Sequence, residues 1–181
     1  MRATPLAVAA LAAALLVSAC DGGGGHRAGG GGSAGSGKAA GSGDACALGG
    51  VGVQVAASAA PAAGDSGDVT VTITNRGAEC TLNGFPDVRL HAGGGTSTLP
   101  SDKAARAQKL TLAKDATASF TITYVRGEAG GGQSLAVRTA GFSLPGSSAE
   151  HRFTWSYGDV AVKGGAHEPN ASVTSFQQAG D

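Results

Sequence analysis

The sequence predicts an all-β protein, an immunoglobulin-like two-sheet β-sandwich that follows a flexible tether rich in glycine and serine. Glycine contributes 32 of the 181 residues, and long runs of Leu, Glu, Lys and Arg, the residues typical of helices, are missing. β-Branched residues instead alternate with polar residues in short segments. A period of two is typical of half-buried strands, and glycine between such segments marks turns. These observations favour strands and tight turns throughout the folded part.

The N-terminal segment predicts export. An apolar run from Leu6 to Leu16 follows the cation Arg2, and it is too short to span a bilayer but suits an export signal. The small residues before Cys20 make the segment similar to the lipobox of bacterial lipoproteins, in which the cysteine is alkylated with diacylglycerol and becomes the mature N-terminus. We therefore expect a signal peptide over residues 1–19, a lipid anchor on Cys20 and a place at the outer face of the cytoplasmic membrane. An ordinary secretory signal, which would give a secreted protein, is the alternative.

Residues 20–45 predict a flexible linker between the anchor and the folded domain. Beyond Cys20 they are almost entirely Gly, Ser and Ala with scattered charges, a composition that behaves as a random coil with a reach of roughly 25 to 30 Å. The segment 32–39 approaches the sequence of a phosphate-binding loop, but Ala39 stands where the magnesium-binding Ser or Thr is needed. We therefore expect no nucleotide site, and one β-sandwich domain over residues 46–181.

The first expected strands are residues 51–55 and 68–74, where Val and Ile alternate with other residues. Between them, Gly64-Asp65-Ser66-Gly67 is similar to the nucleophile loop of chymotrypsin-like proteases. Those enzymes carry a catalytic His and Asp upstream, whereas the upstream histidine here is His26, in the linker. We interpret the segment as a turn, because Gly, Asp and Ser all favour a tight reversal.

The later strands follow from the same alternation, with glycine or Lys-Asp reversals between them. They are residues 88–91, 110–112, 119–125, 134–139, 151–157, 160–162 and 171–177. Residues 101–108 have a helix-favouring composition, enough for one or two turns. About nine short strands fit two packed sheets.

Cys46 and Cys80 predict a disulfide. If Cys20 carries lipid, these two cysteines remain as a pair in an oxidising compartment. The bridge would close a loop of about 34 residues and would stabilise the domain by about 3 to 4 kcal/mol. Two free, buried thiols are the alternative.

The passage from Asn75 to Leu90 is the most individual in the chain. It runs Asn-Arg-Gly-Ala-Glu-Cys-Thr-Leu-Asn-Gly-Phe-Pro-Asp-Val-Arg-Leu. With the Thr-rich strand before it, it resembles the core of domain of unknown function 4232, which is common in actinobacterial envelope lipoproteins. The resemblance continues through residues 120–124 to the C-terminal strands. It implies a single-bridge member of the family, because the two further cysteines that many members carry are absent here, and it brings no established activity.

Aromatic residues give a candidate binding surface, made of Phe85, Trp155 and Tyr157. Phe85 precedes Pro86, and such a pair can either fill the core or form a ligand-facing corner; we interpret it as core packing. Phe153, Trp155 and Tyr157 share one face of a strand by the period of two. They form either an exposed platform for sugar rings or a partner protein, or a part of the core, and we favour the core.

The sequence contains few features that are typical of nucleic-acid binding, metal binding or catalysis. The 13 basic and 13 acidic residues give a formal net charge of zero, so the sequence lacks the excess of basic residues that is typical of nucleic-acid-binding proteins. His26, His91, His151 and His167 match no metal-ligand spacing, and we expect neither a metal nor a cofactor. No set of nucleophile, base and orienting residue is brought together by the sequence itself.

These observations lead us to expect a membrane-anchored, non-catalytic binding or interaction module of the cell envelope. Its partner, apart from the membrane that holds the lipid, is an unidentified protein or envelope polymer. One alternative is an envelope hydrolase with a site assembled from distant loops, which would need a deep polar cleft. The other is a purely structural spacer.

Overall fold

The computed structural model describes residues 44–164 and 168–178. The expected signal peptide, Cys20, most of the linker, His26 and His167 lie outside the described residues. The part of the chain that is described is all-β apart from one 3-10 turn, η1 (Leu48–Gly50), and its strands pair almost throughout in antiparallel sheets. The predicted fold class is confirmed at this level. None of the described helical segments has the length and apolar character needed to cross a membrane.

The larger sheet contains β1 (Val51–Ser58), β2 (Ser66–Asn75), β7 (Thr117–Val125) and β13 (Ala171–Val173), in that order, and β14 (Gln177–Gln178) also pairs with β7. β2 lies between β1 and β7 in an antiparallel register over its full length. This strand therefore lies inside the sheet, and its uninterrupted alternation of apolar and polar residues buries one of its faces in the core.

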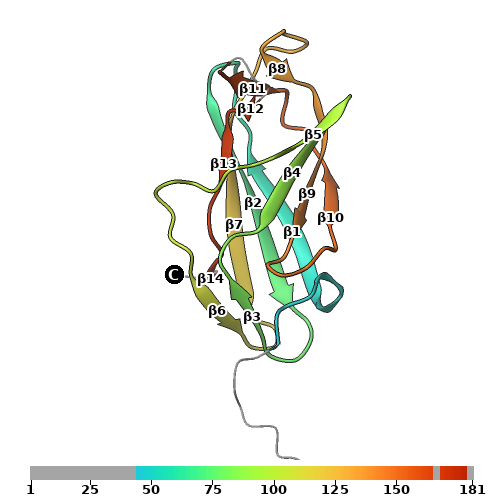
Figure 1. Ribbon diagram of the computed structural model, residues 1–181, viewed down its shortest axis with the longest axis vertical. Coiled ribbons are helices and arrows are strands. Elements are labelled where there is room, and N and C mark those ends of the chain that lie inside the picture. Colours follow the sequence, from blue (N-terminus) through green and yellow to red (C-terminus); the bar gives the residue numbers. More distant parts are fainter. Residues whose placement is uncertain (1–43, 165–167, 179–181) are drawn as a thin grey trace, which may run out of the picture. The chain divides into compact units, whose positions relative to one another are not determined.

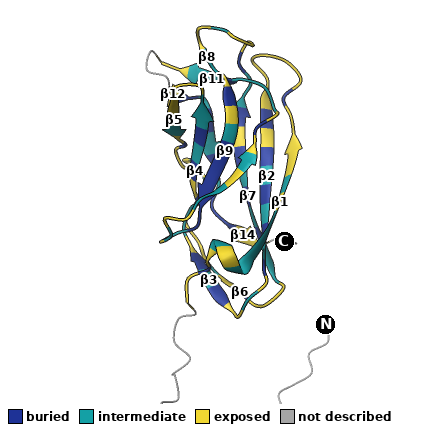
Figure 2. Ribbon diagram, turned by 90° about the vertical axis from the view of Figure 1, so that its right-hand side faces the viewer, coloured by how far each residue is buried: buried dark blue, intermediate teal, exposed yellow. Residues whose placement is uncertain are grey.

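The second large sheet has the order β10 (His151–Thr154), β9 (Val137–Ser143), β4 (Asp87–Ala92) and β5 (Gly95–Thr98). Two small sheets complete the fold. They are β12 (Glu168–Pro169), β11 (Val160–Lys163) and β8 (Ser134–Leu135) at one end, and β3 (Cys80–Asn83) with β6 (Lys109–Leu112) at the other (Figure 1). The two large sheets form the layers of a β-sandwich-like body, and buried residues fill the space between them (Figure 2).

The core follows the alternation that the sequence predicts. Val69, Val71 and Ile73 of β2 are fully buried, whereas the residues between them are partly exposed. Across the sandwich, the Phe120 ring packs edge-on against Phe142, with 5.2 Å between centroids. Such edge-to-face contacts add to the free energy of burying the rings.

Several segments differ from their predicted secondary structure. The strand predicted over residues 134–139 is interrupted between β8 and β9, and the one predicted over residues 171–177 is interrupted between β13 and β14. Residues 101–108 form no helix, because Ser101 bridges to Val173 in parallel and Asp102 Oδ1 accepts a hydrogen bond from the Ala104 amide, which makes a turn. The strand expected over residues 151–157 ends at Thr154. Beyond it the chain turns, and the Trp155 indole N–H closes that turn by donating to the Gly158 carbonyl at 2.7 Å.

The interpretation of Phe85 as a core residue is wrong. Pro86, Val88 and Leu90 are buried, so the inward-facing positions here are the even ones. Phe85 has the opposite parity and is only partly buried, outside the core cluster.

Candidate functional site

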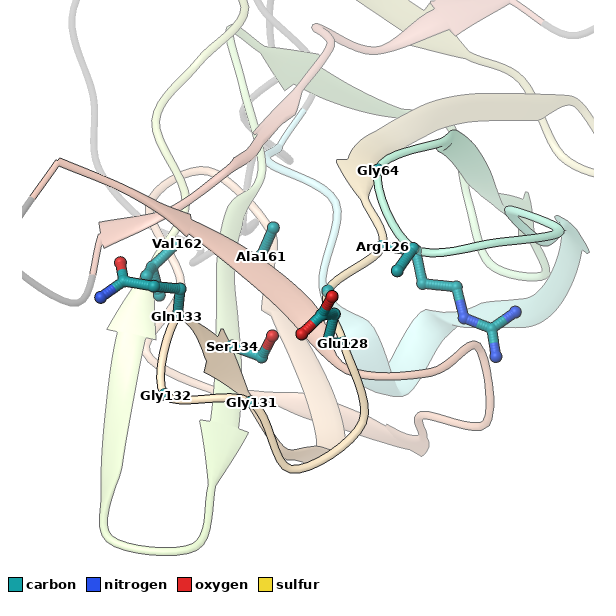
Figure 3. A pocket seen from close by; sticks show the side chains of 11 residues that line it. Gly64, Arg126, Glu128, Gly131, Gly132, Gln133, Ser134, Ala161 and Val162 are labelled. Atoms are coloured by element: carbon teal, nitrogen blue, oxygen red, sulfur yellow. The ribbon is translucent and has the colours of Figure 1, made fainter.

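A groove of about 490 Å³ lies at the end of the domain that carries β8 and β11 (Figure 3). Three segments that are distant in sequence form its walls. They are residues 63–64 between β1 and β2, residues 126–134 after β7, and residues 161–162 of β11. Grooves of this size, with a few polar groups among apolar ones, are common ligand sites.

The first wall, residues 63–64, ends at Gly64, the first residue of the segment that is similar to a protease loop. The Asp65 carboxylate accepts a hydrogen bond from the Ala62 amide at 3.1 Å, and the Gly64 amide donates to the Arg126 carbonyl at 2.8 Å. The Arg126 amide in turn donates to the Asp65 carbonyl at 2.9 Å. Gly64 and Asp65 thus belong to a turn that is bonded to the end of β7, while Ser66 and Gly67 of the same segment already belong to β2.

The side chain of Arg126 also stabilises this turn, through the residues that precede it. Its Nη1 donates to the Ala60 carbonyl at 2.9 Å and to the Pro61 carbonyl at 3.0 Å. In Figure 3 its side chain extends away from Gln133 and Ser134. The guanidinium therefore bonds to two carbonyls of the protein itself and stabilises the turn beside the groove.

Two glycines determine the conformation of the second wall, residues 126–134. Gly130 has a φ of +68°, a conformation that residues with a Cβ rarely adopt, and its amide donates to Asp159 Oδ2 at 2.9 Å. A Cβ at Gly127 would collide with Ser134 Oγ. The Val162 amide donates to the Gln133 carbonyl at 3.0 Å, which joins this wall to β11. Hydrogen bonds to Asp159 and to β11 therefore hold this Gly-rich loop in one conformation.

The polar side chains that line the groove beside Arg126 are one carboxylate, Glu128, and two groups that both donate and accept hydrogen bonds, Gln133 and Ser134. Glu128 is exposed, and its carboxylate has no hydrogen-bond or ion-pair partner within residues 44–164 and 168–178. Its side chain lies on the same side of the groove as the Ser134 hydroxyl, while Gln133 and Val162 lie further along (Figure 3). Because a carboxylate accepts hydrogen bonds, the part of the groove around Glu128 suits a ligand group that carries hydroxyl, amide or amino hydrogens.

A second polar cluster lies on the outward face of the β4–β9–β10 sheet. His91 Nε2 is 3.2 Å from Glu150 Oε1, and Arg152 Nε donates to Glu150 Oε2 at 2.5 Å. His91 Nδ1 is 3.0 Å from the Thr96 hydroxyl. A Cβ at Gly141 would lie 2.5 Å from Glu150 Oε1, so any larger residue there would displace this carboxylate from its present position. The hydrogen bond from Arg152, followed by that from His91, lowers the pKa of Glu150 in spite of the partial burial that raises it.

The predicted disulfide is confirmed. Cys46 and Cys80 are bonded, and the two chain segments around them are held side by side, since the Cys46 amide donates to the Thr81 carbonyl and the Thr81 amide donates to the Asp44 carbonyl. The alternative of two free thiols is wrong. The bridge connects the start of the domain to β3, at the end of the domain away from the groove (Figure 1).

The three residues of the predicted aromatic surface do not come together as a platform. Trp155 is only 4% exposed and packs edge-on against Tyr124 on one side and Tyr157 on the other, each at 5.0 Å between centroids. Tyr157 and Phe153 are half-buried against the core. The core alternative therefore holds for Trp155, and Phe85 lies apart from it, between β3 and β4.

Sequence reasoning missed the groove. Its turns were visible as Gly64 and as the Gly-rich loop around residues 130–132, but neither contains a signal that the two loops meet. No group of three His, Cys, Asp or Glu side chains that could hold a metal occurs in the described part of the chain, which includes His91 and His151.

The comparisons with known proteins identify the family and no single relative. No curated protein and no solved structure matches the chain. The family model described as "Domain of unknown function (DUF4232)" matches residues 46–177. These residues span almost the whole described domain, from the first bonded cysteine to β14. The chain therefore belongs to the family of domain of unknown function 4232.

Proposed function

We propose that the protein is a lipid-anchored envelope lipoprotein whose sandwich domain binds an envelope polymer or protein through the groove. The supporting observation is the placement of the groove. The chain enters the described domain beside β3, where Asp44 is hydrogen bonded to Thr81, and the groove lies at the opposite end (Figure 1). The groove is therefore distant from Asp44, where the expected linker joins the domain.

The proposal includes an immunoglobulin-like arrangement of the two large sheets. The β1-β2-β7-β13 and β10-β9-β4-β5 sheets are both antiparallel, and a buried Trp packs against a Tyr between them. Loops gathered at one end of such a sandwich are a common place for binding residues, because the sheets hold them rigidly.

The ligand chemistry follows from Glu128, Gln133 and Ser134. We expect a neutral or cationic ligand that is rich in hydroxyl, amide or amino groups, which describes envelope polymers as well as exposed protein loops. A charge-assisted hydrogen bond to the carboxylate would contribute most to affinity.

Glu128→Gln tests this binding site. The chain carrying Cys20→Ala, so that no lipid contributes, is mixed with isolated cell envelope and the bound fraction is measured by co-sedimentation. Glu128→Gln should weaken binding about tenfold. The matched control is Glu79→Gln, an exposed carboxylate beside Cys80 at the other end of the domain, and it should bind as the parent does. Equal loss in both variants, or no binding by the parent, would contradict the proposal.

The anchor is tested separately. Cells that produce the protein are fed a labelled fatty acid, and label is expected on the parent chain but not on Cys20→Ala. Label that survives the substitution would place any lipid elsewhere, and absence of label would favour a secreted protein.

A hydrolase is the second candidate, and the Thr96–His91–Glu150 cluster is the observation that favours it. A hydroxyl, an imidazole and a carboxylate lie in hydrogen-bonded order there. The cluster lies on a sheet face, outside the groove residues, and Arg152 occupies the second carboxylate oxygen. Ester hydrolysis that is lost in His91→Ala would favour the hydrolase over the binding module.

A further inference from the structure

The segment that leads from β5 into β6 and on to β7 is a second candidate interaction surface. Residues 103–114 contain four of the 13 basic residues of the chain, Lys103, Arg106, Lys109 and Lys114, and no Asp or Glu. The chain as a whole carries as many acidic as basic residues, so positive charge is concentrated in this segment. A concentration of one sign of charge attracts ions of the other sign and raises their local concentration.

Three of these cations form what we call the cationic row, Lys103, Arg106 and Lys109. All three side chains are exposed. Within the part of the chain that the structure describes, their charged groups make no hydrogen bond and no ion pair. The ammonium and guanidinium donors of the row therefore remain available to an external anion.

The carboxylates next to the row leave most of its charge uncompensated. Asp102 Oδ1 accepts a hydrogen bond from the Ala104 amide at 2.8 Å, and Glu168 Oε1 lies 3.5 Å from Lys163 Nζ. Asp102, Glu168, Lys163 and Lys103 line one hollow of about 470 Å³. Because Lys163 offsets the charge of Glu168 there, Asp102 offsets at most one charge of the row.

The row runs lengthwise along the domain. Lys103 lines that hollow together with Lys163 of β11 and Glu168 of β12, whereas Lys109 begins β6, which pairs with β3 where the chain enters the domain. The segment between them passes along the side of the domain (Figure 1). The six residues from Lys103 to Lys109 span at most about 20 Å, with at most about 10 Å between neighbouring cations.

We propose that the cationic row binds a linear polyanion, a polymer that carries anionic groups in series. One exposed cation gains little from one anion, but a polymer that meets three cations in succession forms its later contacts within one complex and releases counterions at each.

The shape of the row favours a linear polymer over a flat anionic membrane. The row is bent, because the Ala105 amide donates to the Asp102 carbonyl at 3.2 Å in a turn. A flexible polymer can follow this bend. A membrane that holds the expected anchor near Asp44 would meet the row at Lys109 alone, and this part of the comparison rests on the proposed lipid anchor.

Binding of inorganic polyphosphate to the purified full chain carrying Cys20→Ala tests the row, and the affinity should fall steeply as salt is added. Lys103→Gln with Arg106→Gln should weaken binding about tenfold or more and flatten the salt dependence. The matched control is Arg76→Gln with Arg138→Gln, which removes the same charge at two exposed positions outside residues 103–114 and should retain most of the parent's affinity. Absence of binding by the parent, or equal loss in the two double variants, would overturn the proposal.

Two other anions separate the row from different kinds of site. Orthophosphate at the same total phosphate concentration should displace little polyphosphate, because a single anion lacks the gain from linked contacts. Vesicles of phosphatidylglycerol should bind the parent more weakly than polyphosphate does. Full displacement by orthophosphate would indicate a site for one anion, and equally tight binding of vesicles would indicate a lipid surface, so either result would overturn the proposal. The outcome is independent of the groove, because no residue of the row lines it.

Discussion

Asn75 shows how one polar side chain can organise a chain reversal. It is 2% exposed, and its side-chain amide donates to the carbonyls of Ala78, Leu112 and Ala113, at 2.8, 3.0 and 3.2 Å. Its Oδ1 accepts a hydrogen bond from the Gly77 amide at 3.0 Å. The links to residues 112–113, at the end of β6, depend on the tertiary fold and have no signal in the local sequence.

Replacement of Asn75 by Asp should be strongly destabilising. The carboxylate would face carbonyl oxygens in place of the lost N–H donors, at a cost of about 3 kcal/mol. Urea unfolding of Asn75→Asp measures the loss, and Asn83→Asp, at an exposed position on β3, should unfold as the parent does. Equal stability of the parent and Asn75→Asp would contradict the bonding described here.

Tyr124 joins the loop behind the groove to the aromatic core. Its hydroxyl donates to the Tyr157 carbonyl at 2.8 Å and accepts from the Ala60 amide at 3.2 Å. Tyr124→Phe leaves the buried Ala60 amide unpaired and should lower the free energy of unfolding by about 2 kcal/mol. Tyr157→Phe removes a hydroxyl for which the described part of the chain provides no partner, and thermal unfolding should show little change for it.

Glu150 should make the free energy of unfolding depend on pH in the acid range. Its pKa is lowered in the folded state, from an ordinary 4.5, mainly by the hydrogen bond from Arg152. The stabilisation is therefore complete above pH 4.5 and is lost as the pH falls through the lowered value. The gap in unfolding free energy between the parent and Glu150→Gln should be largest near neutral pH and shrink in acid. Arg152→Gln should flatten this dependence, and an unchanged gap at low pH would contradict the ion pair.

The strands show which elements can be predicted from local pattern. β2 and β7 were predicted almost to their ends, because buried residues alternate along their whole length. β12 and β14 are two residues long and have no period to detect, so their pairing depends on neighbours that come from elsewhere in the chain. Residues 101–108 have helix-forming composition, but the contact of Ser101 with Val173 decides their conformation.

The disulfide connects two segments whose proximity in space the local sequence pattern does not predict. It closes a loop of 34 residues between the start of the domain and β3. Replacing Cys46 and Cys80 together by Ser should lower the free energy of unfolding by about 4 kcal/mol, because the unfolded chain gains the freedom that the bridge removes. Urea unfolding of the double variant measures this, with the parent after reduction as the matching control. A loss well below 1 kcal/mol would show that the bridge is not a main constraint.

At the scale of the whole molecule, composition and alternation were enough to predict an all-β body with an aromatic core. They could not predict the groove, because its walls come from three segments separated by tens of residues, and glycine loops of this kind look alike whether or not they meet. The same holds for the cluster of His91, Glu150 and Arg152, where residues on β4 and around β10 become neighbours only through β9. The position of β1 at the edge of the described sheet likewise becomes visible only once the strand order is known.

Site-specific photo-crosslinking in intact cells tests the central claim most directly. A photoreactive amino acid is placed at Gln133 in the groove or at Glu79, exposed beside Cys80 at the opposite end of the domain. Irradiation should give a discrete adduct from position 133 and none from position 79, because the account assigns binding to the groove end. Adducts from position 79 alone, or equal adducts from both positions, would contradict it.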